Sequence, residues 1–171
     1  CMDICLETDQ YDVDAMMGKA RCAAALGDSE TEKKYCEQVI ATPGASPNLV
    51  ASAYCNLGVL HAGQENEADF YRASLKLKPD SFETLYSLGA ALANQEEWEQ
   101  AVETYKRAIQ ALDDDSYQLR TALQSLYVAV MHMLRARNQV LSSREEAIEL
   151  FQQAMGRENF TKMTALQGQQ G

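Results

Sequence analysis

The residues of this chain best able to bind a metal ion or act as nucleophiles are five cysteines and two histidines. No two cysteines form a CxxC pair, and the two thiols that could share a helix face, Cys1 and Cys5, do not make a zinc site alone. His61 and His132 lie too far apart and too isolated to complete one. We therefore expect no metal and no cofactor, and we interpret the cysteines as small apolar residues in a reducing compartment. The remaining cysteines are Cys22, Cys36 and Cys55.

Acidic side chains are the other candidates for catalysis, and their densest run is Asp113, Asp114 and Asp115. This run ends a predicted helix in solvent, whereas a catalytic carboxylate pair needs burial to shift its pKa. The sequence contains no glycine-rich phosphate-binding loop and no nucleophile within a known local motif. We therefore expect that this chain is not an enzyme.

The net charge is −10, from 25 acidic and 15 basic residues. Such a chain repels phosphate backbones unless it has a local basic patch, and no run of lysine and arginine supplies one. No apolar run approaches the roughly 20 residues that a membrane helix needs, and no signal peptide is visible. We expect neither nucleic-acid binding nor membrane insertion, and an intracellular, reducing location, with the cytoplasm the first choice.

The clearest structural signal is the segment from Phe82 to Asp115. Apolar residues recur there at intervals of three and four, on both sides of the short polar sequence NQEE. This pattern predicts two helices packed as an antiparallel hairpin. Gly89 lies inside the first helix, where glycine costs about 1 kcal/mol relative to alanine, and it suggests the close approach of a neighbouring helix. Ala101 and Ala108 leave space on the second helix, and Tyr105 fills the space between them.

The same pattern recurs along the chain. Upstream, Gly58 stands 31 residues before Gly89. Downstream, Ala147 follows Ala101 by 46 residues, about a dozen more than the period of roughly 34. The extra length predicts a first helix prolonged from Tyr117 to about Asn138.

The prolonged helix leaves two interpretations open. It could dock another subunit through Val128, Met131 and Leu134, or its extra turns could pack on their own partner helix. An exposed apolar stripe would favour docking. We also expect Ser142 or Ser143 to cap the helix that follows.

The segment from Phe82 to Asp115 resembles a tetratricopeptide repeat in its leucine–glycine pair, its alanines and its aromatic residue. The resemblance implies an all-α, right-handed α-solenoid of antiparallel hairpins. About four repeats are expected, with a truncated helix before them and a possible capping helix after them. Expected boundaries are 1–12 for the truncated repeat, 13–46, 47–81, 82–115 and 116–159 for the repeats, and 160–171 for the capping helix and a loose tail.

In such a solenoid the first helix of each hairpin lines a concave surface. Its residues not used in packing are candidates to hold a protein or peptide, and tyrosine and arginine are frequent hot spots. By register, the candidate groove residues are Arg21, Asn56, Glu83, Tyr86, Tyr117, Arg120, Gln124 and Tyr127.

One ligand of the family can be tested against these positions. Tetratricopeptide co-chaperones clamp the acidic C-terminal tail of large chaperones with lysines, asparagines and an arginine. Asn56 matches one clamp asparagine, but the other corresponding places hold Met17, Arg21, Glu83 and Ser87, and Glu83 would repel the carboxylate. We therefore expect no carboxylate clamp.

The leading hypothesis is a protein-interaction scaffold that binds a peptide or helix in its concave groove. One alternative is a structural subunit of a large assembly, docking through the long helix and the solenoid ends. Another is a recruitment module of a longer enzyme.

Overall fold

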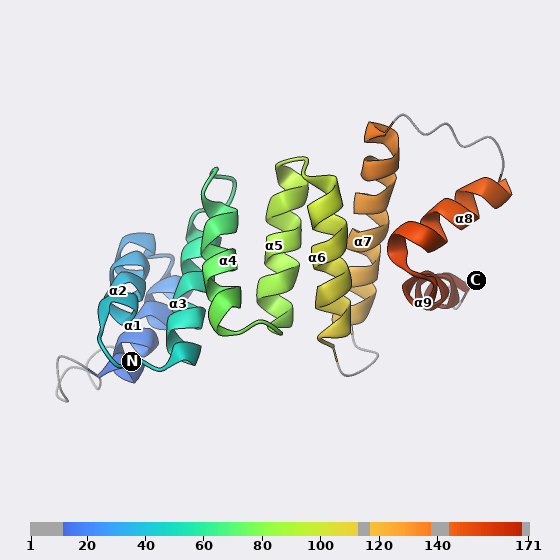
Figure 1. Cartoon of the computed structure of the whole chain (residues 1–171). Coiled ribbons are helices and arrows are strands. Elements are labelled where there is room, and N and C mark those ends of the chain that lie inside the picture. Colours follow the sequence, from blue (N-terminus) through green and yellow to red (C-terminus); the bar gives the residue numbers. More distant parts are fainter. Residues whose placement is uncertain (1–11, 113–116, 138–143, 169–171) are drawn as a thin grey trace. The chain divides into compact units, whose positions relative to one another are not determined.

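The computed structural model describes residues 12–112, 117–137 and 144–168, and this part of the chain is all-α (Figure 1). It divides into two compact units, Cys1–Pro79 and Asp80–Gly171. None of the described helices is long and apolar enough to span a membrane. The helices are α1 (Val13–Leu26), α2 (Ser29–Ala41), α3 (Pro47–Leu60), α4 (Glu67–Leu77), α5 (Phe82–Asn94), α6 (Trp98–Gln110), α7 (Tyr117–Ala136), α8 (Arg144–Met155) and α9 (Arg157–Gly168).

Three helices of the first unit, α1, α2 and α3, start at residues that favour a helix N-terminus. Asp12 caps α1 by accepting hydrogen bonds from the backbone N–H groups of Asp14 and Ala15, at 3.0 and 3.3 Å. Asp28 caps α2 in the same way through the N–H of Thr31. Hydrogen bonds from the Thr31 side chain and then from its backbone lower the pKa of the Asp28 carboxyl group. Pro47 opens α3 at the first position, where its missing N–H costs nothing.

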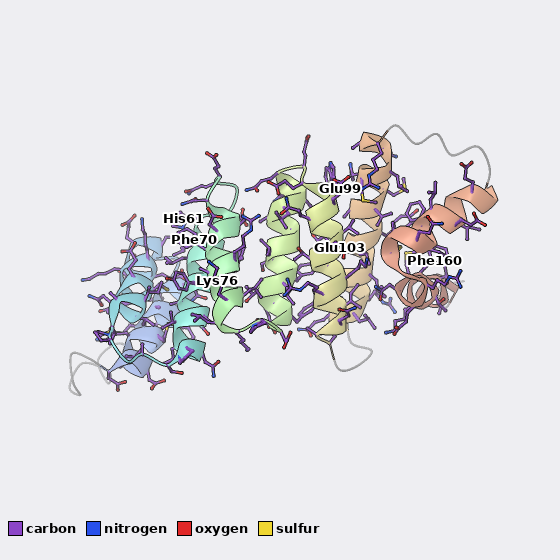
Figure 2. The ribbon with its side chains drawn as sticks, viewed as in Figure 1. His61, Phe70, Lys76, Glu99, Glu103 and Phe160 are labelled. Atoms are coloured by element: carbon purple, nitrogen blue, oxygen red, sulfur yellow. The ribbon has the colours of Figure 1, made fainter. Side chains whose placement is uncertain are left out.

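The first unit forms two hairpins, α1–α2 and α3–α4, with α2 packed on α3 (Figure 1). The core between them is built from one face of each helix, as the three- and four-residue spacing predicts. His61, at the end of α3, lies against the ring of Phe70 of α4 at a centroid distance of 4.7 Å (Figure 2). The buried core residues are Met17, Ala20, Cys36, Val39, Ala53 and Leu57.

In the second unit, α5 and α6 form a hairpin, and α7 packs against α6 (Figure 1). Ser81 caps α5 through the N–H of Thr84. The predicted packing faces of these helices are buried, including Leu85, Leu92 and Ile109.

A glycine meets a tyrosine ring in a hairpin of each unit. A Cβ placed on Gly89 would lie 2.8 Å from the Cδ1 and Cε1 atoms of Tyr105. A Cβ placed on Gly58 would lie 2.5 Å from Cε1 of Tyr71. Real Cβ atoms essentially never come so close to another heavy atom, so glycine is required for these rings to fit. The predicted close approach at Gly89 is confirmed.

The turn inside each of the three hairpins contains one residue with a positive φ. Gly27 and Gly63 take this conformation between α1 and α2 and between α3 and α4. Between α5 and α6, Glu96 takes it instead, at φ 61°. A side chain disfavours the left-handed region, so the third turn carries backbone strain that the other two avoid.

The last two helices depart from the hairpin pattern. In Figure 1, α8 runs at a steep angle to α7 and leads into α9, and both helices contact α7. Leu123 of α7 stands 34 residues after Gly89, one repeat later, and is fully buried. Phe151 of α8 is buried as well. It stacks on Tyr127, one turn further along α7, at 5.0 Å.

The extra turns of α7 pack within the second unit. Leu134 is buried and Met131 is half-buried, and only Val128 of the three expected docking residues is exposed. The exposed apolar stripe that would have favoured docking therefore does not run through all three residues, because the last turns of α7 pack toward α6 and α8. The expected truncated repeat at 1–12 lies outside the described residues except for Asp12, and the expected caps Ser142 and Ser143 lie wholly outside them.

Candidate interaction surfaces

The exposed face of α7 is formed by residues that recur every three or four positions. Tyr117 is 83% exposed and Val128 is 47% exposed, while Arg120 and Gln124 lie between them and are also exposed. This face lies opposite the buried one, which includes Leu126 and packs toward α6. Three of the predicted groove residues, Tyr117, Arg120 and Gln124, are thus brought together on one accessible surface.

Tyr86, which we predicted to be a binding hot spot, makes several contacts within the second unit. Its hydroxyl group lies 3.1 Å from the Ser125 hydroxyl of α7, and its ring packs on Phe82 and Tyr105 at 5.8 and 5.6 Å. Burial, together with the neighbouring Tyr86, raises the pKa of Tyr105 to about 12, and a hydrogen bond from Ser125 partly opposes this rise. Tyr86 therefore helps to hold α5, α6 and α7 together, although its side chain stays half-exposed.

Tyr127 is also engaged within the second unit through its stack on Phe151. Glu83 is exposed on α5, and its Oε2 atom accepts a hydrogen bond from the Ser81 hydroxyl at 3.3 Å. Sequence reasoning missed the Tyr86–Ser125 bond, since its partners stand 39 residues apart on different helices.

In the first unit, the predicted groove residues are Arg21 and Asn56. Arg21 is exposed on α1, and Asn56 is half-buried on α3. Asn56 hydrogen-bonds the Cys36 thiol, whose pKa is raised to about 11 by burial first and by Glu32 second. Met17, one of the clamp positions, is 4% exposed and belongs to the core.

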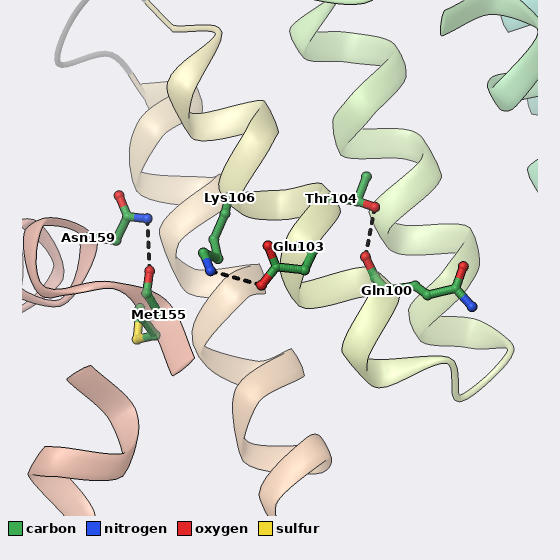
Figure 3. Close-up of polar contacts among 6 residues, drawn as sticks. All are labelled: Gln100, Glu103, Thr104, Lys106, Met155 and Asn159. Atoms are coloured by element: carbon green, nitrogen blue, oxygen red, sulfur yellow. Dashed lines mark hydrogen bonds and ion pairs between the residues drawn. The ribbon is translucent and has the colours of Figure 1, made fainter. Parts of the chain in front are cut away.

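Apart from these exposed faces, the second unit has a hollow between α6, α7 and α8. Its volume is about 470 Å³, and both charged side chains and the apolar residues Met133, Leu134 and Leu150 line it. Its charged groups pair with one another. Arg137 donates to Glu99 at 3.0 Å, and Lys106 lies 2.9 Å from Glu103 (Figures 2 and 3).

A smaller hollow of about 430 Å³ continues along α6 beside α9 and shares Lys106 with the first. At its rim, the Asn159 amide donates to the Met155 carbonyl at 3.0 Å (Figure 3). Glu158 pairs with Lys162, whose hydrogen bond and charge lower the pKa of the Glu158 carboxyl group. These internal pairs leave few free charges to attract a ligand.

Both histidines are occupied by packing. His61 hydrogen-bonds the Leu57 carbonyl through Nδ1 at 2.8 Å, and the His132 ring stacks on Trp98 at 4.4 Å, joining α7 to α6. Within the described ranges, no group of three histidine, cysteine, aspartate or glutamate side chains is placed to bind a metal ion. The described cysteines, Cys22, Cys36 and Cys55, form no disulfide with one another.

Comparison with known proteins adds the family. Residues 84–116 match the model of the tetratricopeptide repeat. The chain is 35% identical over 77 residues to the peroxisomal targeting signal receptor of Eremothecium gossypii, over 43% of this chain and 14% of the receptor. The chain thus matches only a small part of that relative's length.

The crystal structure of MamA has a TM-score of 0.65 against this chain, at 18% identity, over 96% of this chain and 87% of MamA. This likeness concerns the fold. The matched repeat and this likeness together show that the chain contains a tetratricopeptide repeat within an all-α helical-repeat fold.

Proposed function

We propose that the chain is a protein-interaction scaffold that holds a segment of a partner protein on the exposed faces of its first helices. The observation that carries the proposal is the face of α7, where Tyr117 and Val128 stay exposed with Arg120 and Gln124 between them. An exposed aromatic ring beside an arginine is typical of binding hot spots. The E. gossypii relative is named as the receptor for a targeting signal, which agrees with a role in recognition.

The two hollows along α6 are weaker candidates for the binding surface. Most of their charged side chains are paired with one another. Docking of another subunit through the set of Val128, Met131 and Leu134 loses support as well, because Leu134 is buried. The proposed surface is therefore the face of the first helices.

A pair of matched cross-linking variants tests the proposal. Gln124 of α7 and Gln110 of α6 are both exposed glutamines, one on a first helix and one on a second helix. Each is replaced with a photoreactive amino acid in the full chain, and the purified variants are irradiated with a partner previously identified by affinity purification. We expect cross-links from position 124 and few or none from position 110.

The double change of Tyr117→Ala with Gln124→Ala should weaken binding of the same partner by about tenfold or more, since hot-spot truncations often cost over 1 kcal/mol each. Circular dichroism should show an unchanged helix content, because both side chains are exposed. Cross-linking from position 110 alone, with undiminished binding by the double variant, would disprove the proposed surface.

A further inference from the structure

Acidic residues are distributed unevenly between the first helices, α1, α3, α5 and α7, and the rest of the chain. The chain carries 25 acidic and 15 basic residues, yet α7 has two arginines and no acidic residue in twenty positions. The four first helices, α1, α3, α5 and α7, together contain only two acidic residues, Asp14 and Glu83, and α3 has no charged residue at all. The faces proposed to bind a partner are therefore those from which acidic side chains are largely missing.

The two arginines of α7 are also accessible to a ligand. Arg120 and Arg135 are exposed, and neither takes part in an ion pair with another described residue. Arg137, only two residues beyond Arg135, is paired with Glu99. An exposed guanidinium group with no internal partner can give all its donors to a carboxylate, often as a bidentate pair.

The spacing of these arginines defines a ligand. Arg120 and Arg135 are fifteen residues apart, so their backbone positions are separated by about 22 Å along the helix axis. Val128 lies near the middle and is 47% exposed. An extended peptide rises about 3.3 Å per residue, so about seven residues cover the same distance.

We propose that the exposed face of α7 recognises an extended acidic segment of a partner protein, with carboxylates about seven residues apart on Arg120 and Arg135 and an apolar side chain between them on Val128. The inference rests on the proposed function and adds the chemistry of the partner. The net charge of −10 opposes binding of an acidic segment, because the protein as a whole repels acidic chains. Binding therefore requires contact with both arginines of α7, and acidic chains whose carboxylates lack the matching spacing are expected to bind weakly.

The probe is a fluorescent peptide of about ten residues with two glutamates seven positions apart, a leucine midway and otherwise glycine and serine. One control peptide has lysines in place of the glutamates, and another has the same composition with the glutamates adjacent. Binding to the full chain is followed by fluorescence anisotropy at low and high salt. We expect the spaced acidic probe to bind most tightly and to weaken as salt rises.

Charge-reversal variants locate the site. Arg120→Glu with Arg135→Glu should weaken the probe by about tenfold or more, because repulsion replaces two attractions. The matched control is Lys76→Glu with Arg157→Glu, which changes the net charge equally on α4 and α9 and should leave affinity within about twofold. Glu83→Gln, which removes the acid of α5, should leave binding equal or slightly stronger.

Three outcomes would overturn the inference. The first is equal loss of affinity in the α7 variant and its matched control, which would indicate a net-charge effect. The second is equal binding of the spaced and adjacent peptides. The third is equally tight binding of a single-stranded oligonucleotide, which would make the face a general anion surface. If natural partners cross-link at position 124 but bind the charge-reversed protein normally, the inference fails and the proposed function stands.

Discussion

Replacing a helical glycine with alanine should have opposite effects at two positions of the same unit. Gly18 and Gly58 both lie inside helices, α1 and α3, where alanine is favoured over glycine by about 1 kcal/mol. No atom outside the local backbone lies within 4 Å of a Cβ placed on Gly18. On Gly58, the same Cβ would lie 2.5 to 2.8 Å from three atoms of the Tyr71 ring.

The magnitudes follow from these distances. Gly18→Ala should raise the free energy of unfolding by about 1 kcal/mol. Gly58→Ala gains the same propensity but pushes on a buried ring that is 3% exposed, and such overpacking costs about 1–3 kcal/mol. The net effect is a loss of up to about 2 kcal/mol, so the two variants should differ by about 1–3 kcal/mol.

The assay is urea unfolding of the full-length variants, followed by circular dichroism, with hydrogen exchange on peptides from α3 and α4 to locate the effect. Gly89→Ala, against Tyr105, should repeat the loss in the second unit. If Gly58→Ala and Gly89→Ala stabilise the protein as much as Gly18→Ala does, the rings of Tyr71 and Tyr105 move aside without cost. The close contact would then not require glycine at these positions.

Three further results are expected. Cys36 should react with iodoacetamide far more slowly than the half-buried Cys22 at mildly alkaline pH, because burial raises its pKa to about 11; peptide mass spectrometry measures the rates, and equal rates would contradict the buried site. Glu32→Gln should stabilise the protein at pH 7. Burial raises the pKa of Glu32, so the folded state loses stability as pH rises from the ordinary glutamate pKa through the raised one, and glutamine carries no charge to bury. The gain should vanish below the ordinary glutamate pKa, and a gain that persists there would refute this cause. Phe151→Ala should cost about 3 kcal/mol by removing the stack on Tyr127, and a loss below 1 kcal/mol would mean that α8 is held by other contacts.

Much of the fold could be predicted from local patterns. The three- and four-residue periodicity predicted the packing faces of α5 and α6, and a glycine inside a helix indicated the close approach of the neighbouring helix. These features depend on residues within one hairpin, so spacing along the chain is enough to find them.

Features that depend on distant residues were harder to predict. The steep packing of α8 and the stack of Phe151 on Tyr127 were not predicted, because they depend on which helices pair with α7. The burial of Met17 and Leu134 depends in the same way on neighbouring helices. For the proposed binding face, the sequence pattern predicted that Tyr117, Arg120 and Gln124 are not used in packing, and all three are exposed on α7. The pattern did not show that Tyr86 and Tyr127 are held by internal contacts.

The stack of Trp98 on His132 has a practical consequence for assigning ligands. Trp98 is the only tryptophan of the chain and lies on α6, so tryptophan emission reports on the second unit alone. A ligand that binds only the folded state stabilises it by mass action, by about 2.7 kcal/mol at a hundredfold excess over its Kd. A ligand of α7 should therefore delay loss of the Trp98 signal, whereas a ligand of the first unit should act mainly on the dichroism of α1–α4.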